Sequence, residues 1–342
     1  MATAAPFSSH PSNGAENSAF PTLASTASAM GETALHATGV GRFAPSPSGD
    51  LHLGNLRTAL LAWMWARTTG RKFVLRIEDI DRVRSGSTQR QIDELTALGI
   101  DWDGEVLIQS SRAQVHDEAV ARLFHEGYAF ECFCSRKDIR EASSAPHVPP
   151  GHYPGTCLHL SEAEISRKRE EFATEGRRPA LRLKAPVAEW TVHDEYFGDY
   201  TGPVDHFVIQ RSDGAPAYNL AVVVDDAFQG VDQVVRGDDL LSQSPGQAVL
   251  ARLLDYPEVT YVHVPLVLSA SGARLAKRDG AVTIEELTEQ GVSIAQIIEV
   301  LAHSMGVKGV HSASQLLESM DVERLRALPQ EPWTPDLERL FA

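Results

Sequence analysis

Residues 41–55, GRFAPSPSGDLHLGN, decide the fold of this chain. The first residues end a short strand, the prolines require a constrained turn, and apolar residues follow at helical spacing over 56–65. In such a strand, loop and helix, free amide groups and the positive end of the helix dipole favour a bound phosphate. His52 would lie there, and Gly54 would let the backbone approach the ligand. Taken alone, these residues also fit an ordinary turn with an exposed histidine.

Length and charge limit the possible classes of protein. The 342 residues suffice for two domains, and no apolar run approaches the roughly 18 residues that a membrane span needs. We therefore expect a soluble, cytoplasmic protein with no membrane partner, and three cysteines agree with a reducing compartment. The net charge of −15 argues against a general nucleic-acid binder, so any nucleic acid must meet local basic patches.

Residues 1–38 are rich in Ala, Ser and Thr and contain no Lys or Arg. We expect a disordered tail, because this composition cannot form a core. It resembles neither a secretory signal nor a transit peptide.

Two predicted strands end in charged residues. Residues 72–78 end at Glu78, and helices over 87–98 and 112–125 complete half of a doubly wound α/β domain. Ligands bind at the carboxyl ends of such strands, so Glu78 would hold a substrate ammonium unless it belongs to a charged loop. A later strand carries Arg236, which suits a carboxylate ligand or a structural pair with an aspartate. Tyr218 precedes the apolar run before that strand.

All three cysteines, Cys132, Cys134 and Cys157, lie in one short segment. This clustering predicts a structural zinc site that closes a loop. The fourth ligand stays open: on chemistry alone His152 or His159 is favoured over Tyr153, because imidazole is the commoner donor. Nearby, Arg167 to Arg169 and Arg177 to Arg178 form a basic region, either a solvated helix face or a site for backbone phosphates.

Small residues surround Lys277 and Arg278 in the stretch 269–280. Such a loop can deliver positive charge to a phosphate, although the string alone also fits any exposed basic loop.

Taken together, HLGN at 52–55 and RLAKR at 274–278 resemble the two signature loops of class I aminoacyl-tRNA synthetases, in matching order and separation. GRFAPSPSG and RIEDIDR look like the glutamyl branch, and the resemblance runs over about 41–306. Within that branch three features resemble the glutamyl-queuosine tRNA(Asp) synthetase family. These are Val222 in place of asparagine, too little chain after Gly280 for an anticodon-binding domain, and a cysteine arrangement that implies Tyr153 as the fourth zinc ligand.

The signatures also depart from the general pattern. Asn55 stands where the first loop usually has a second histidine. In the second loop Arg274 replaces lysine and keeps its charge, whereas Ala276 replaces serine and loses a hydroxyl. Lys277 is therefore the expected phosphate contact.

The resemblance implies an α/β, Rossmann-type class I catalytic domain. Its halves would span 39–127 and 204–268, with a zinc-containing acceptor-binding-like insertion at 128–203 and a loop plus helical region at 269–342. The implied activity is tRNA-independent activation of L-glutamate with ATP and Mg²⁺, then transfer to the queuosine base in the anticodon of tRNA(Asp). Alternatives are a truncated glutamyl-tRNA synthetase that charges the 3′ end and a non-catalytic nucleotide-binding module. We expect a monomer.

The resemblance also implies roles for individual residues. Catalysis falls to His52 and Lys277. The expected ATP-binding residues are Pro45, His52, Gly54, Asn55, Arg274, Leu275, Ala276, Lys277 and Arg278. The expected glutamate-binding residues are Arg42, Phe43, Ala44, Pro45, Ser46, Glu78, Tyr218 and Arg236. The expected zinc ligands are Cys132, Cys134, Tyr153 and Cys157.

Overall fold

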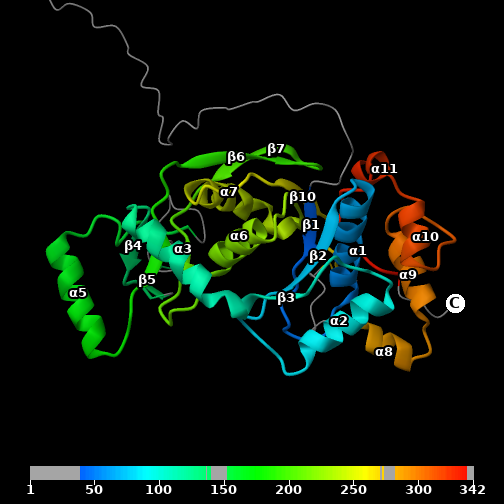
Figure 1. The fold of residues 1–342 in the computed structure, drawn as a ribbon, viewed down its shortest axis with the longest axis horizontal. Helices are drawn as coiled ribbons and strands as arrows, with labels where there is room; N and C mark the ends of the chain where they lie inside the picture. The colour runs from blue at the N-terminus through cyan, green and yellow to red at the C-terminus, as the bar shows by residue number, and fades with distance from the viewer. Residues whose placement is uncertain (1–38, 136, 140–151, 270–271, 273–281, 337–342) are drawn as a thin grey trace, which may run out of the picture. The chain divides into compact units, whose positions relative to one another are not determined.

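The computed structural model describes residues 39–135, 137–139, 152–269, 272 and 282–336 (Figure 1). Two groups of sequence predictions fall elsewhere. The predicted tail, 1–38, and the predicted second signature loop lie outside the described residues; the loop residues concerned are Arg274, Leu275, Ala276, Lys277 and Arg278.

Seven strands form the main sheet, in the order β3-β2-β1-β9-β10-β6-β7. Neighbouring strands pair in parallel except β6 and β7, which form an antiparallel hairpin at one edge. The bounds are β1 Val40–Phe43, β2 Lys72–Ile77, β3 Leu107–Ile108, β6 Glu189–Asp194, β7 Gly198–Pro203, β9 Gln233–Gly237 and β10 Thr260–Val264. The strand order runs outward in both directions from the join of β1 and β9. Open α/β sheets bind ligands beside such a join, at the carboxyl ends of the strands.

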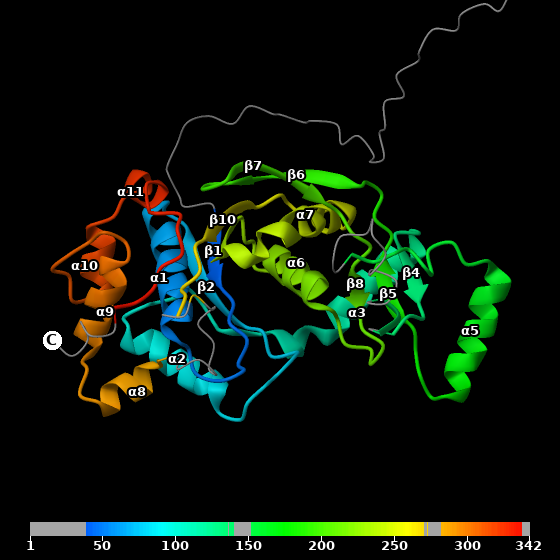
Figure 2. The same cartoon turned by 180° about the vertical axis from the view of Figure 1, so that it is seen from behind.

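Helix α1, Leu53–Thr68, is the central helix, and most of its side chains are buried. It packs against β1, β2 and β9. Figures 1 and 2 place α1 on one face of the main sheet and α6 and α7 on the other. The remaining helices of this part are α2 Ser87–Ala97, α3 Ala113–His125, α6 Tyr218–Phe228 and α7 Ser244–Leu253, with 3-10 turns at Gln109–Arg112 and Asp238–Gln243. The predicted doubly wound arrangement of strands and helices is thus observed.

A second, smaller sheet has three antiparallel strands in the order β4-β5-β8. Its strands are β4 Ala129–Cys132, β5 Ala180–Leu183 and β8 Val208–Gln210, and helix α5, Glu162–Thr174, follows β4 in the chain. This part has a small core of its own that includes Cys132, Tyr153 and Cys157.

The predicted boundary at residue 203 does not follow the division between the two sheets. Strands β6 and β7 lie within 128–203 but belong to the main sheet, whereas β8 comes after 203 and belongs to the small one. Gly198, with a φ of 66°, returns the chain into β7, and β6 pairs with β10. Short segments with mixed polarity cannot reveal which sheet they join, because that choice depends on a distant strand.

Four short helices follow the gap after residue 272: α8 Ile284–Glu289, α9 Ile294–His303, α10 Ala313–Glu318 and α11 Val322–Arg326. This region contributes Leu316, Met320, Leu325 and Leu328 to the same core as α1, while Leu317 is partly buried. Among the described helices, none has both the length and the apolar character that crossing a membrane would require.

Candidate active site

His52 is the residue before the first turn of α1, and its side chain caps the helix. The Nδ1 atom accepts hydrogen bonds from the backbone N–H groups of Gly54 at 3.1 Å and Asn55 at 3.3 Å. The Asn55 side chain in turn accepts from the His52 backbone at 3.3 Å. The sequence predicted these amides as free phosphate donors, and for Gly54 and Asn55 that is wrong, because the imidazole already uses them. A neutral His52 must then carry its hydrogen on Nε2, so Nε2 is the donor atom of the neutral ring.

The described ends of the second signature loop lie beside this capped helix. On the returning side, the Leu53 N–H donates to the Val282 carbonyl at 3.3 Å, and His52 forms a β-bridge with Thr283. On the leading side, a Cβ placed on Gly54 would lie 3.3 Å from Val267, so only glycine fits there without displacing a neighbour. Both ends of the segment thus meet the start of α1, although Lys277 itself lies outside the described residues.

A cavity of about 140 Å³ opens at the join of β1 and β9. It brings together many of the predicted site residues from four separate segments. Those that line it are Arg42, Phe43, Ala44, His52, Gly54, Asn55, Glu78, Tyr218 and Arg236. Pro45 and Ser46 are not among its lining residues. The Pro45 carbonyl accepts from the Glu78 backbone at 2.9 Å, and Ser46 lines a neighbouring groove.

Buried charges stabilise one another behind this cavity. Arg42 contacts Asp226 at 3.3 Å, and Arg76 contacts both Asp226 at 2.8 Å and Glu78 at 3.0 Å. Burial raises the pKa of Glu78, while the positive charges of Arg76 and Arg42 act against that rise. Arg42, predicted to face the ligand, is therefore also part of an internal ion pair.

Arg236 differs from the other two arginines. Its guanidinium donates to His263 Nε2 at 3.0 Å, Gln247 Oε1 at 2.8 Å and Ser244 Oγ at 2.7 Å, all neutral acceptors. It forms no ion pair with a carboxylate of the described residues, so the alternative of a structural Arg–Asp pair is wrong within that part of the chain.

Charged side chains are buried around the cavity. Three arginines, Arg42, Arg76 and Arg236, face two carboxylates, Glu78 and Asp226, and all five are less than a tenth exposed. A third buried carboxylate, Asp194, lies behind Arg236 and is linked to it through His263. Asp239 also lines the cavity, but it is an exposed residue at the rim.

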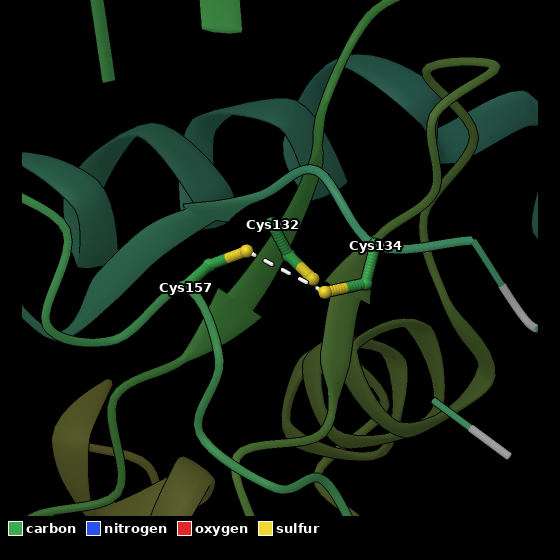
Figure 3. Close-up of side chains that lie close together, drawn as sticks. All are labelled: Cys132, Cys134 and Cys157. Carbon is green, nitrogen blue, oxygen red and sulfur yellow. Dashed lines mark hydrogen bonds between the residues drawn. The ribbon is translucent and has the colours of Figure 1, made fainter. Parts of the chain in front are cut away.

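The three cysteines converge as the sequence predicted. Their sulfur atoms all lie within 4.8 Å of one another, and Figure 3 shows the side chains pointing toward a common centre. The Tyr153 hydroxyl lies 3.5 Å from Cys132 Sγ and 3.8 Å from Cys134 Sγ. Neither His152 nor His159 belongs to the cluster; His152 faces Asp205, with Nδ1 3.9 Å from a carboxylate oxygen. This set of donors could hold a metal ion.

The thiols influence one another strongly. Hydrogen bonds from Cys134 and Cys157 hold the pKa of Cys132 far below its usual range, and the same contacts raise the pKa of Cys134. Three thiolates at this spacing repel one another unless a cation lies among them, and metal binding requires the deprotonated form. The cluster is therefore suited to a divalent metal.

A larger groove of about 900 Å³ extends from the cavity to the cysteine cluster. Glu78 and Tyr218 line both hollows, and Cys132 and Cys134 line the far end of the groove. Its walls carry four arginines, Arg177, Arg178, Arg182 and Arg211, and three carboxylates, Glu78, Asp81 and Asp213. Arg211 pairs with both aspartates, and Arg177 pairs with Glu175. Part of the predicted basic region is neutralised locally, because Arg167 pairs with Glu171 and Arg169 with Glu131.

Comparison with known proteins identifies the family. Residues 40–340 match the family described as tRNA synthetases class I (E and Q), catalytic domain. The protein named Glutamyl-Q tRNA(Asp) synthetase from Nocardia farcinica is 54% identical over 295 residues, which cover 86% of this chain and 92% of that protein. The chain belongs to the glutamyl-Q tRNA(Asp) synthetase family. A protein of the same name from Cutibacterium acnes is 44% identical over 285 residues, which cover 82% of this chain and 80% of that protein.

A solved structure supports the fold of this glutamyl-Q tRNA(Asp) synthetase family member. The glutamate tRNA ligase of Elizabethkingia meningosepticum matches with a TM-score of 0.74 at 24% identity, over 89% of this chain and 68% of that one. The predicted α/β class I catalytic domain is therefore confirmed.

The sequence analysis did not predict the role of several residues of the site. Arg76 lies on β2, two positions before Glu78, which directly follows the strand; both side chains lie on the same side, and this spacing was available as a signal. Asp226 ends the apolar run after Tyr218, and nothing local in the sequence connects it with Arg76. Gln247 and His263 carry no local pattern, because only the pairing of distant elements brings them to Arg236.

Arg76→Met is expected to lower the free energy of unfolding by about 3–5 kcal/mol, because it leaves the buried Glu78 without its cationic partner. Urea unfolding measures the change. The double variant Arg76→Met with Glu78→Gln should recover much of the loss. As a control, Arg71→Met removes a more exposed pair with Asp232 and should cost less than about 1 kcal/mol. A single variant as stable as the parent protein would contradict the buried network.

Proposed function

We propose that this chain activates L-glutamate with ATP in the absence of tRNA and transfers the glutamyl group to the queuosine base in the anticodon of tRNA(Asp). The observation that carries the proposal is the 54% identity with the Nocardia farcinica protein, which this chain matches over 92% of that protein's length. The cavity supports the first step, because Arg42, Arg236 and Glu78 line it and their charges complement the two carboxylates and the ammonium of glutamate.

Each end of glutamate has a suitable partner in the cavity. Arg236 binds a carboxylate, because its guanidinium lines the cavity and is bound only to neutral acceptors in the described chain. Glu78 accepts from the ammonium, and the Tyr218 hydroxyl donates to a remaining oxygen. A site that pairs every polar group of its substrate discriminates strongly against analogues that leave one unpaired. We assign supporting contacts to Arg42, Phe43, Ala44, Pro45 and Ser46.

In the first reaction a carboxylate oxygen of glutamate attacks the α-phosphorus of ATP, and the bond to the bridging oxygen of pyrophosphate breaks. A carboxylate needs no base, so positioning supplies much of the rate. His52 donates from Nε2 to the phosphate, and Lys277, from the loop whose ends meet α1, adds positive charge. The other ATP contacts are Pro45, Gly54, Asn55, Arg274, Leu275, Ala276 and Arg278. Mg²⁺ bound with ATP would neutralise charge on the phosphates.

The cysteine cluster is proposed as a structural zinc site with Cys132, Cys134, Cys157 and Tyr153 as ligands. Three sulfur atoms and the phenol oxygen converge and would supply the four donors that a structural zinc site needs. The small core around the cluster consists largely of these same residues, so the metal would supply much of its stability.

We further propose that residues 39–127 and 204–268 form the catalytic halves, with β6 and β7 of 128–203 added to the main sheet. The rest of 128–203, together with β8, forms the zinc-containing part. The described helices of the segment 269–342 support the loop. The monomeric state and the cytoplasmic compartment stay predictions.

Arg236→Ala is expected to lower glutamate-dependent ATP–pyrophosphate exchange by about a hundredfold or more, because a buried charged partner of the substrate is lost. The assay is run without tRNA. Arg252→Ala is the matched control: Arg252 lies on α7, outside the cavity, and contacts Glu258 at 3.7 Å. Exchange at the parental rate in the Arg236 variant would refute its assignment.

Metal analysis of the purified protein should find one zinc per chain. Cys134→Ser is expected to release it and to lower the melting temperature of the small sheet before it affects adenylate formation. Tyr153→Phe should weaken zinc binding, whereas His159→Ala should retain it, because His159 lies outside the cluster. The opposite result for these two variants would restore histidine as the ligand, and full stability of metal-free protein would exclude a structural zinc.

The transfer step is tested with labelled glutamate and tRNA(Asp) that either contains or lacks queuosine. The proposal expects label only on the queuosine-containing tRNA, recovered with the anticodon fragment after nuclease digestion. Label on the 3′-terminal ribose would instead identify a truncated glutamyl-tRNA synthetase. Absence of both exchange and transfer would leave a non-catalytic nucleotide-binding module.

A further inference from the structure

Three buried residues on adjacent strands form a chain of hydrogen bonds that ends at the cavity. Arg236 on β9 and His263 on β10 are directly opposite in the parallel register, and Asp194 ends the next strand, β6. Asp194 and His263 are fully buried, so water cannot substitute for any of these contacts.

Asp194 determines which nitrogen of His263 carries the hydrogen. One carboxylate oxygen lies 2.6 Å from His263 Nδ1 and 3.1 Å from the His263 backbone nitrogen. The other oxygen accepts from the backbone N–H groups of Tyr196 at 2.9 Å and Phe197 at 3.0 Å. Burial alone would raise the pKa of Asp194, but the hydrogen bonds from His263 and from these two N–H groups outweigh it and hold the pKa below its usual range. An ionised Asp194 can only accept, so Nδ1 of His263 is the protonated nitrogen.

The other nitrogen of His263 then presents a lone pair to Arg236. Arg236 Nε donates to His263 Nε2 at 3.0 Å, and Ser244 Oγ lies 3.2 Å from the same atom. A protonated imidazole would direct an N–H group at the guanidinium and would repel it. Burial, together with the charge of Arg236, lowers the pKa of His263 despite the opposing effect of Asp194.

We propose that His263 is a positioning residue for the glutamate site: its neutral imidazole, oriented by Asp194, fixes the Arg236 guanidinium toward the substrate carboxylate. The inference rests on the proposed function, because it assumes that Arg236 binds glutamate. The β6–β7 hairpin lies at the edge of the sheet, and its Asp194 is not a lining residue of the cavity. Under this proposal the hairpin nevertheless affects amino-acid binding, because Asp194 orients His263.

The charged and titratable groups that face His263 limit what pH can do. They are Asp194 from β6, Arg236 from β9 and, on β10 itself, Tyr261, whose ring stacks at a centroid distance of 5.6 Å; Arg42 on β1 adds a more distant positive charge. Among His263 and these neighbours, only His263 has an ordinary pKa between about 5 and 8. Because its pKa is lowered, the imidazole stays neutral as the pH falls past about 6.5 and gains its charge only below that value.

His263→Leu is expected to raise the KM for glutamate in ATP–pyrophosphate exchange about tenfold to a hundredfold, with the KM for ATP nearly unchanged, because the guanidinium loses its fixed acceptor. His263→Gln places an amide oxygen near the former Nε2 and should recover most of the affinity. In the parent protein the KM for glutamate should rise below about pH 6.5, and the rise should be smaller in the Gln variant, in which Glu78, whose pKa is raised, still titrates. An unchanged KM for glutamate in His263→Leu would overturn the inference.

Two further measurements separate a positioning role from loss of fold and from failure of the proposed function. His116→Leu is the matched control: His116 is also fully buried and lies 3.0 Å from Asp225, but it does not line the cavity, so its KM for glutamate should stay parental in folded protein. Nitrogen NMR of the full-length protein at pH 8 should show His263 protonated on Nδ1. Protonation on Nε2 would overturn the inference whatever the activity, whereas absence of glutamate activation in the parent, with Nδ1 protonated, would reject only the proposed function.

Discussion

The arrangement depends on burying three arginine side chains beside two carboxylates at the join of β1 and β9. A buried charge is tolerated only when it is paired or hydrogen-bonded. Arg76 forms ion pairs with Asp226 and Glu78, and Arg42 shares Asp226. The guanidinium of Arg236 is hydrogen-bonded to neutral acceptors. These charged groups are therefore held in place by the sheet and do not depend on a flexible surface residue.

The start of α1 illustrates how one residue serves both the fold and the site. His52 caps the helix through Nδ1, and this same bond leaves Nε2 as the hydrogen donor of the neutral ring. The helix start also contacts Val282 and Thr283, which follow the second signature loop. Segments more than two hundred residues apart in sequence therefore meet at the place where phosphate chemistry is proposed. Helix formation, loop attachment and ligand geometry all use the same backbone turn.

The two sheets have different sources of stability. The main sheet buries α1 and the C-terminal helices in a continuous apolar core. The small sheet has only a limited core, and the cysteine sulfurs are part of it. Helix α5 buries none of its side chains fully, which agrees with its charged sequence. A metal among the thiols would therefore matter more here than anywhere in the main sheet.

The sequence by itself determined the elements whose pattern is local. Residues 41–55 encode the strand, turn and helix, the spacing of Cys132, Cys134 and Cys157 predicted one cluster, and the two signature loops indicated the family. Tertiary structure alone decided which distant groups meet. It paired β6 with β10 and so placed Asp194 against His263, it put the Tyr153 hydroxyl among the thiols, and it gave Arg236 neutral partners in place of an aspartate. The physical reason is that periodicity and capping act over a few residues, whereas hydrogen-bond partners of buried polar groups are selected by packing across the whole sheet.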